Sequence, residues 1–277
     1  MGWYGELLVG FDLETTGTDP GEARIVSAAV VEAVRGVPAR RREWLADPGV
    51  PVPPETTAIH GITDERATAH GRPAAEVADE VAEVLAAHWA RGVPVVAYNA
   101  AFDLTLLTAE LRRHGLAPMR ERLGGREEGP VIDPYAMDRT VDPFREGKRT
   151  LEAVCAEYGV VLGRAHDAAE DALAAVRLAV AIAERYGDVA TADAWDLHRG
   201  QAGWHAERAE GHRTAARRSA LRGGDGGHPG GGAPEGFRAW LLSPCPATEL
   251  ADLPPDGRDV QPVETAPDLP SRGGSGR

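Results

Sequence analysis

The order in which apolar patterns follow one another along the chain restricts its fold more than any other feature. Two strand-like apolar runs occupy residues 6–13 and 24–34, and a third short strand is expected around 43–45. Beyond them, apolar residues at helical spacing alternate with brief apolar runs up to about residue 186. Strands followed by alternating helices and strands predict an α/β fold in which helices cover a mixed sheet.

The second part of this pattern also indicates where its elements begin. Pro73 suits the first turn of a helix, while Asn99 and Thr150 are residue types that cap helices. From periodicity and caps we expect a helix over 73–90, a strand over 93–97, a helix capped by Asn99, a strand at Val131 and Ile132, a helix capped by Thr150 and a helix over 168–186.

The C-terminal part of the chain differs in composition. From about Arg222 onward Gly, Pro, Asp and Arg dominate, and apolar periodicity is lost, which is typical of segments that do not fold alone. Residues 195–221 keep a helical pattern, but their apolar face is thin and their second half is basic. We therefore expect a globular domain over 1–187, a basic helical extension over 188–222 and a disordered tail over 223–277.

The cysteines and the N-terminus bear on the compartment. Two cysteines, Cys155 and Cys245, are too few and too far apart for a disulfide framework or a metal-binding knuckle. The chain starts without a basic region followed by a cleavage site, and no apolar run approaches the roughly 20 residues that span a bilayer. We expect a cytoplasmic protein with no membrane partner.

Two carboxylates stand at the end of the first strand. Side chains two residues apart in a strand project from the same face, so Asp12 and Glu14 lie side by side. Like charges held so close repel each other unless a cation lies between them. A solvated acidic strand end is the alternative interpretation of such a pair.

Two later segments place further polar groups at element ends. Asp103 falls in the first turn of the helix after the 93–97 strand, where the helix dipole favours an anion. His166 precedes the last helix, and Asp171 lies in that helix's first turns. Taken singly, Asp103 can be a helix-stabilising acid and His166 a solvated histidine, but such ends gather at one edge of an α/β sheet.

These five residues together resemble the motifs of the DEDDh family of 3′→5′ exonucleases. The family carries D-x-E, N-x-x-x-D and H-x-A-x-x-D in this order, and every motif position is present here. The resemblance covers residues 7–186 and is greatest to the proofreading epsilon subunit of bacterial DNA polymerase III. It implies an RNase H-like fold with a central, mixed, five-stranded sheet flanked by helices.

A two-ion site is what the resemblance implies for the acidic residues. The ions would be Mg²⁺ or Mn²⁺, held around a scissile phosphate, and His166 would accept the proton of the attacking water. The residues that would hold the ions are Asp12, Glu14, Asp103 and Asp171.

The resemblance also implies a pocket for the terminal nucleotide. Thr15, Thr16, Ile59 and His60 would contact its sugar and base, although from the residues alone His60 can equally be an ordinary loop residue. Arg145, Lys148 and Arg149 are candidates for steering phosphates, or else belong to a solvated loop.

The expected partner is the 3′ end of single-stranded DNA, from which nucleoside 5′-monophosphates would be released in proofreading or repair. The net charge of −13 is unfavourable for such a partner unless divalent cations bridge carboxylates and phosphate. An exoribonuclease stays open, since no residue identifies recognition of a 2′-OH. A further alternative is an interaction subunit with secondary catalysis, which binds a DNA polymerase through its C-terminal extension, where Trp240-Leu241-Leu242 is the apolar candidate for docking.

Overall fold

The computed structural model describes residues 2–201, in which one mixed sheet forms the centre of the fold. Its strands, in spatial order, are β4 (Arg72–Pro73), β3 (Val37–Asp47), β2 (Ile25–Val34), β1 (Leu7–Thr15), β5 (Val95–Val96) and β6 (Val131–Ile132). The first three strands of the chain pair as an antiparallel meander, whereas β5 and β6 run parallel to β1. The predicted mixed sheet is confirmed, but it has six strands, because the two-residue β4 adds to the edge beside β3.

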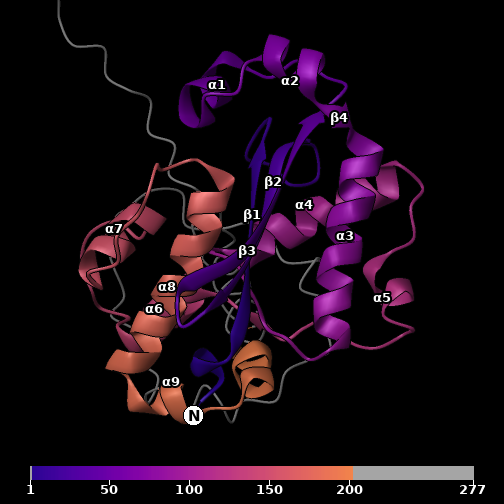
Figure 1. The fold of residues 1–277 in the computed structure, drawn as a ribbon. Helices are drawn as coiled ribbons and strands as arrows, with labels where there is room; N and C mark the ends of the chain where they lie inside the picture. The colour runs from indigo at the N-terminus through magenta and orange to yellow at the C-terminus, as the bar shows by residue number, and fades with distance from the viewer. Residues whose placement is uncertain (1, 202–277) are drawn as a thin grey trace, which may run out of the picture.

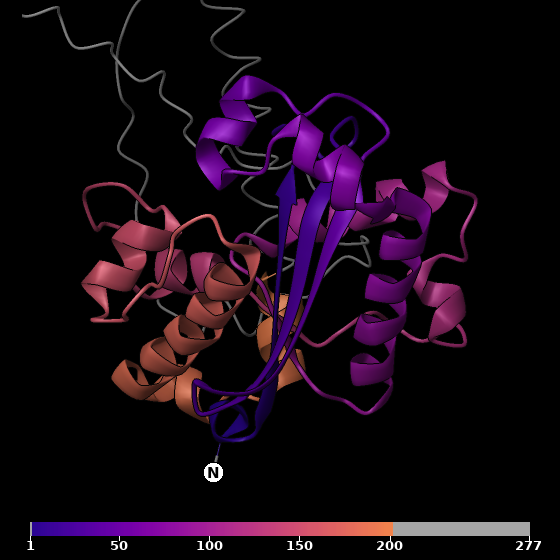
Figure 2. The ribbon, with the colours of Figure 1, turned by 45° about the horizontal axis from the view of Figure 1, so that its top comes forward.

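Helices cover both faces of this sheet (Figure 1). One face carries α3 (Ala74–Ala90), α4 (Ala100–Arg113) and α5 (Met119–Arg122). The other carries α6 (Pro134–Val141), α7 (Leu151–Glu157), α8 (Ala168–Arg185) and α9 (Gly187–Thr191). A short turn of 3-10 helix, η1 (Trp3–Gly5), precedes β1. Figure 2 shows the sheet nearly edge-on, with α8 and α3 on opposite sides of it.

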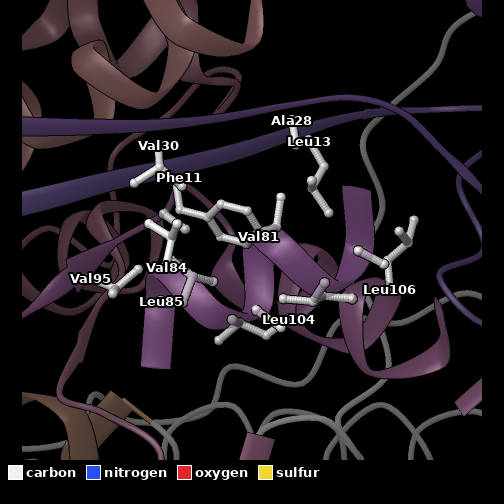
Figure 3. Close-up of a cluster of buried hydrophobic side chains, with 14 of the residues drawn as sticks. Phe11, Leu13, Ala28, Val30, Val81, Val84, Leu85, Val95, Leu104 and Leu106 are labelled. Atoms are coloured by element: carbon white, nitrogen blue, oxygen red, sulfur yellow. The ribbon is translucent and has the colours of Figure 1, made fainter. Parts of the chain in front are cut away.

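The two cores follow from the alternation of side chains along β1. Phe11 and Leu13 point to the side of α3 and α4, where they pack with residues such as Val81, Leu85 and Leu104 (Figure 3). The even-numbered residues of β1 face α8, and Leu8 packs in the core on that side of the sheet. Because the side-chain period of a strand is two, Asp12 and Glu14 also face α8.

Several elements differ from expectation. The Pro-rich segment before residue 72 contains two helices, α1 (Pro54–His60) and α2 (Asp64–His70), which cover the end of the β1–β2 pair (Figure 2). Thr63 caps α2 by accepting the Arg66 N–H. Each helix has seven residues, which is too short for a clear apolar periodicity, so tertiary packing decides their formation.

The predicted caps had mixed outcomes. Thr150 accepts the N–H of Ala153 at the start of α7, as expected. Asn99 occupies the cap position of α4, as predicted, but its side chain makes no capping hydrogen bond. Asn99 adopts a left-handed backbone with φ of 59°, a conformation that asparagine tolerates better than most residues.

The proposed boundaries at 187, 188–222 and 223–277 stay predictions. Within the described part, residues 194–201 are helical, while the remainder of the 195–221 helix, Cys245 and the 240–242 apolar segment lie outside it. Across residues 2–201, no helix combines the length and apolarity needed to cross a bilayer.

The helix over 194–201 attaches to the sheet edge through two buried side chains. His198 accepts the Val131 N–H at 3.2 Å through Nδ1. Gln201 accepts the Asp133 N–H and donates to the Val131 carbonyl, at 2.9 Å in each case. These bonds satisfy backbone groups that β6 would otherwise expose at its free edge.

His198 should make the stability of the protein depend on pH. Burial, together with the charge of Arg199, lowers the pKa of His198 to about 4, whereas an unfolded histidine titrates near 6.5. Between these values the unfolded chain binds a proton that the folded chain does not, so stability falls as the pH decreases. We expect a loss of about 2 kcal/mol between pH 7.5 and pH 5 from this group. Urea unfolding at both pH values measures it, and His198→Gln should reduce the difference by that amount; an equal pH dependence in both proteins would contradict the assignment.

Candidate metal centre

The middle of β1 lies very close to α8, because residue 10 is a glycine. A Cβ built on Gly10 would lie 2.3 Å from the carbonyl oxygen of Ala172, a distance that no side chain can occupy. Gly10, Asp12 and Glu14 share one face of the strand, so the same face that meets α8 carries both acidic residues. Both carboxylates are buried, and a buried charge without a compensating partner destabilises a fold.

Asp103 reaches the same strand end from the other layer. It is fully buried in the first turn of α4, and its Oδ1 accepts the backbone N–H of Leu13 at 3.2 Å. Leu13 lies between Asp12 and Glu14 in the chain. The hydrogen bond therefore fixes the third carboxylate beside the first two.

Asp133 holds the turn from which Asp103 projects, and sequence reasoning missed it. Its Oδ1 accepts the N–H of Asn99 at 2.9 Å, and its Oδ2 accepts that of Ala100 at 3.2 Å. The same residue caps α6 by accepting the Tyr135 N–H. Its position directly after β6 and before Pro134 was the available signal, since aspartate followed by proline is typical of a helix start.

His166 and Asp171 complete the group from the start of α8. The backbone N–H of His166 donates to Asp171 Oδ2 at 3.1 Å, and the side chain of His166 is exposed. His166 has a φ of 61°, so the loop turns sharply at this residue. Ligand atoms of Glu14, His166 and Asp171 all lie within 4.8 Å of one another.

The donor set suits a hard divalent cation. Carboxylate oxygens from a strand and a helix converge, with a histidine beside them, in a partly buried place where their negative charges repel. Asp12 and Asp103 lie outside the closest group of three but belong to the same strand end, through their positions beside Leu13. The structure thus brings all five predicted residues to the C-terminal end of β1, an interior strand of the sheet.

The threonines after Glu14 form the start of the β1–β2 turn. The pairing of β1 with β2 shifts register between Glu14 and Thr15, a bulge of the kind that redirects a side chain next to a site. Thr15 Oγ1 donates to the Gly17 carbonyl at 2.7 Å, and Thr16 Oγ1 accepts the Arg24 N–H at 2.9 Å.

Ile59 and His60 approach this turn from the C-terminal end of α1, not from a loop. His60 Nδ1 accepts the Ile62 N–H at 3.1 Å, which orients the ring. Burial lowers the pKa of His60, the nearby Thr15 backbone opposes this, and the charge of His166 lowers it further. His60 therefore lies near Thr15 and His166, and it lines one groove together with His166. The side chain of Ile59 is 37% exposed.

A groove of about 280 Å³ adjoins these residues. His60, His166, Ser27 and Ala29 are among the residues that line it. Ser27 pairs directly with Glu14 and Ala29 with Asp12, so small side chains continue the acidic rows across the sheet. The groove therefore opens directly beside the carboxylates.

The basic residues 145 and 149 have a different place from the one expected. Both donate to the fully buried Asp138, Arg145 at 2.8 Å and Arg149 at 2.6 Å. Arg149 also donates to the Asp142 carbonyl, and its own carbonyl accepts the Tyr98 hydroxyl at 2.6 Å. These two guanidinium groups hold the loop before α7 together through Asp138, although the loop itself is largely exposed, Lys148 included.

Comparison with known proteins identifies relatives of this arrangement. The family model RNase_T, described as exonuclease, matches residues 9–179. DNA polymerase III subunit epsilon of Treponema pallidum is 30% identical over 169 residues, which cover 61% of this chain and 72% of that protein. The PolC-type DNA polymerase III of Streptococcus thermophilus is 32% identical over 169 residues, and this chain spans 10% of its length.

A solved structure supports the fold independently. The zinc-bound complex of E. coli exonuclease I with single-stranded DNA superposes with a TM-score of 0.59 at 19% identity, over 70% of this chain and 43% of that one. At this identity the likeness concerns the fold, and it includes the mixed sheet flanked by helices.

Proposed function

Because this chain belongs to the RNase_T exonuclease family, we propose that it is a metal-dependent 3′→5′ exonuclease that releases nucleoside 5′-monophosphates from DNA. The observation that carries the proposal is the convergence of Glu14, His166 and Asp171 within 4.8 Å, beside Asp12 and Asp103. Its relatives among DNA polymerase III subunits support DNA as the substrate and a role in proofreading or repair.

In this proposal the residues that hold two Mg²⁺ or Mn²⁺ ions are Asp12, Glu14, Asp103 and Asp171. The cluster of hard carboxylate oxygens supports this role. Once bound, the ions supply positive charge to the scissile phosphate and to the leaving oxygen. The protein's own contribution is rigidity: the Asp103 bond to Leu13 and the contact of α8 with Gly10 hold the carboxylates in place.

His166 is the proposed general base. Its side chain is exposed, so it can exchange protons with solvent, and its backbone is anchored to Asp171 at 3.1 Å. Only a side chain that titrates near neutrality can both accept the proton of an attacking water and release it between turnovers.

The terminal nucleotide is proposed to lie against Thr15, Thr16, Ile59 and His60. The nearness of His60 to Thr15 and His166 supports this, because it brings the α1 residues beside the carboxylates. An exposed apolar side chain such as Ile59 can pack on a base face without reading its sequence.

The activity is tested with the full chain and matched single-stranded DNA and RNA oligonucleotides labelled at the 5′ end. We expect a ladder of products shortened from the 3′ end of DNA in Mg²⁺, and none in EDTA. Faster degradation of the RNA would replace the proposed substrate with RNA, and intact oligonucleotides of both kinds in Mg²⁺ would overturn the function.

Divalent ions should also stabilise the protein without substrate. An ion that binds the folded state alone adds about 1.4 kcal/mol of stability when present at ten times its dissociation constant. We expect Mg²⁺ or Mn²⁺ to raise the thermal midpoint of the protein, and Asp171→Asn to abolish the increase. Asp188→Asn, an exposed acid in α9, is the matched control and should keep it. The same increase in Asp171→Asn would exclude this residue as a ligand.

A further inference from the structure

A second acidic residue of α4, which the proposed mechanism does not use, is buried on the helix that carries Asp103. Glu110 lies seven residues after Asp103, which is about two helical turns, so both project from the same face. Both side chains are completely buried. Asp103 contacts β1 itself, whereas Glu110 lies against the turn that follows β1.

Three basic side chains surround the Glu110 carboxylate. Arg113 donates to it in a close ion pair, Arg24 Nε lies 3.9 Å away, and His114 Nε2 lies 3.5 Å away. Arg113 also donates to the Gly21 carbonyl at 2.9 Å. Glu110 and its partner Arg113 thereby join α4 to two points in the second half of the β1–β2 turn, Gly21 and Arg24.

Arg24 connects the ion pair with Glu110 to Thr16, at the start of the β1–β2 turn. Arg24 and Thr16 bind each other twice, because the Thr16 N–H donates to the Arg24 carbonyl at 3.0 Å and the Arg24 N–H donates to Thr16 Oγ1 at 2.9 Å. The bulge between Glu14 and Thr15 lies directly before this pair. A buried ion pair is weak evidence for stability, but removal of one partner leaves the other charge buried and uncompensated, so the groups around it must rearrange.

We propose that Glu110 is a positioning residue that sets the β1–β2 turn, and with it Thr15 and Thr16, for the terminal nucleotide. The inference rests on the proposed function and deepens it. Without the carboxylate, Arg24 loses its ion pair with α4, and the bond from Arg113 to the Gly21 carbonyl is left without the partner that holds the Arg113 guanidinium.

The test is steady-state hydrolysis by the full chain of the p-nitrophenyl ester of thymidine 5′-monophosphate, which contains one nucleoside and one scissile bond. Contacts made equally in the ground and transition states affect KM and leave kcat unchanged, so we expect Glu110→Gln to raise KM about tenfold at an unaltered kcat. Arg113→Lys, which keeps the charge but cannot bind Glu110 and Gly21 together, should raise KM in the same direction. Glu157→Gln removes an exposed ion pair with Arg185 and is the control, with KM unchanged.

The outcomes separate this inference from the function on which it rests. An inactive wild-type chain on every substrate counts against the function itself. An active wild type with unchanged KM in both variants, or a fall in kcat at constant KM, as fewer folded molecules would give, overturns the positioning role. If Glu110→Gln does not fold, the Arg113→Lys result decides alone.

Discussion

Replacing Asp12 with alanine should reduce degradation of single-stranded DNA by on the order of 10³-fold or more, since bound ions contribute several kcal/mol to such reactions. Asp12 shares its strand face with Glu14, and loss of one carboxylate from a shared site removes its ion. The measurement is the initial rate of 3′ shortening in saturating Mg²⁺.

The same variant distinguishes lost ligation from lost folding. Removal of one member of a buried group of like charges relieves repulsion, so Asp12→Ala should unfold in EDTA at a temperature no lower than the wild type. Glu152→Ala, an exposed acid of α7, is the control for general charge effects and should keep full activity. A fully active Asp12→Ala enzyme would remove this residue from the site.

Replacing His166 with alanine should lower kcat on the order of 10²-fold while leaving Mg²⁺ stabilisation intact, because a general base contributes about that factor without holding the ion. The geometry makes the distinction necessary, since His166 offers a ligand atom to the same group as Glu14 and Asp171. Kinetics and thermal unfolding with a Mg²⁺ titration measure both properties in one preparation. Loss of the Mg²⁺ effect in His166→Ala would make the histidine a ligand, and unchanged kcat would exclude it as the base.

Sequence patterns predicted those parts of the site that depend on local geometry. The period of a strand places Asp12 and Glu14 on one face, and the start of a helix after a buried strand places Asp103. The mixed sheet follows likewise from the order of apolar runs, and the family resemblance added the roles of the five residues. The matching family model supports that resemblance, and the superposed exonuclease supports the fold.

The remaining parts depend on contacts between residues distant in sequence. Asp133 holds the Asn99 turn across 34 residues, and Glu110 reaches the Gly21 turn through Arg113. Arg145 looked available for phosphate because nothing near it in sequence shows that Asp138 is buried beneath it. Short helices such as α1 have too few residues for periodicity to indicate them.

Gly10 has a consequence for which cations the protein can accept. Asp12 and Glu14 belong to β1, and Asp171 belongs to α8. At Gly10 these two elements approach so closely that no side chain fits between them. The distance between the carboxylates on β1 and the one on α8 therefore depends on the absence of a Cβ atom at residue 10. Small ions such as Mg²⁺ need short, uniform bonds, whereas Ca²⁺ accepts longer and more variable ones, so we expect the proposed site to prefer the smaller ion.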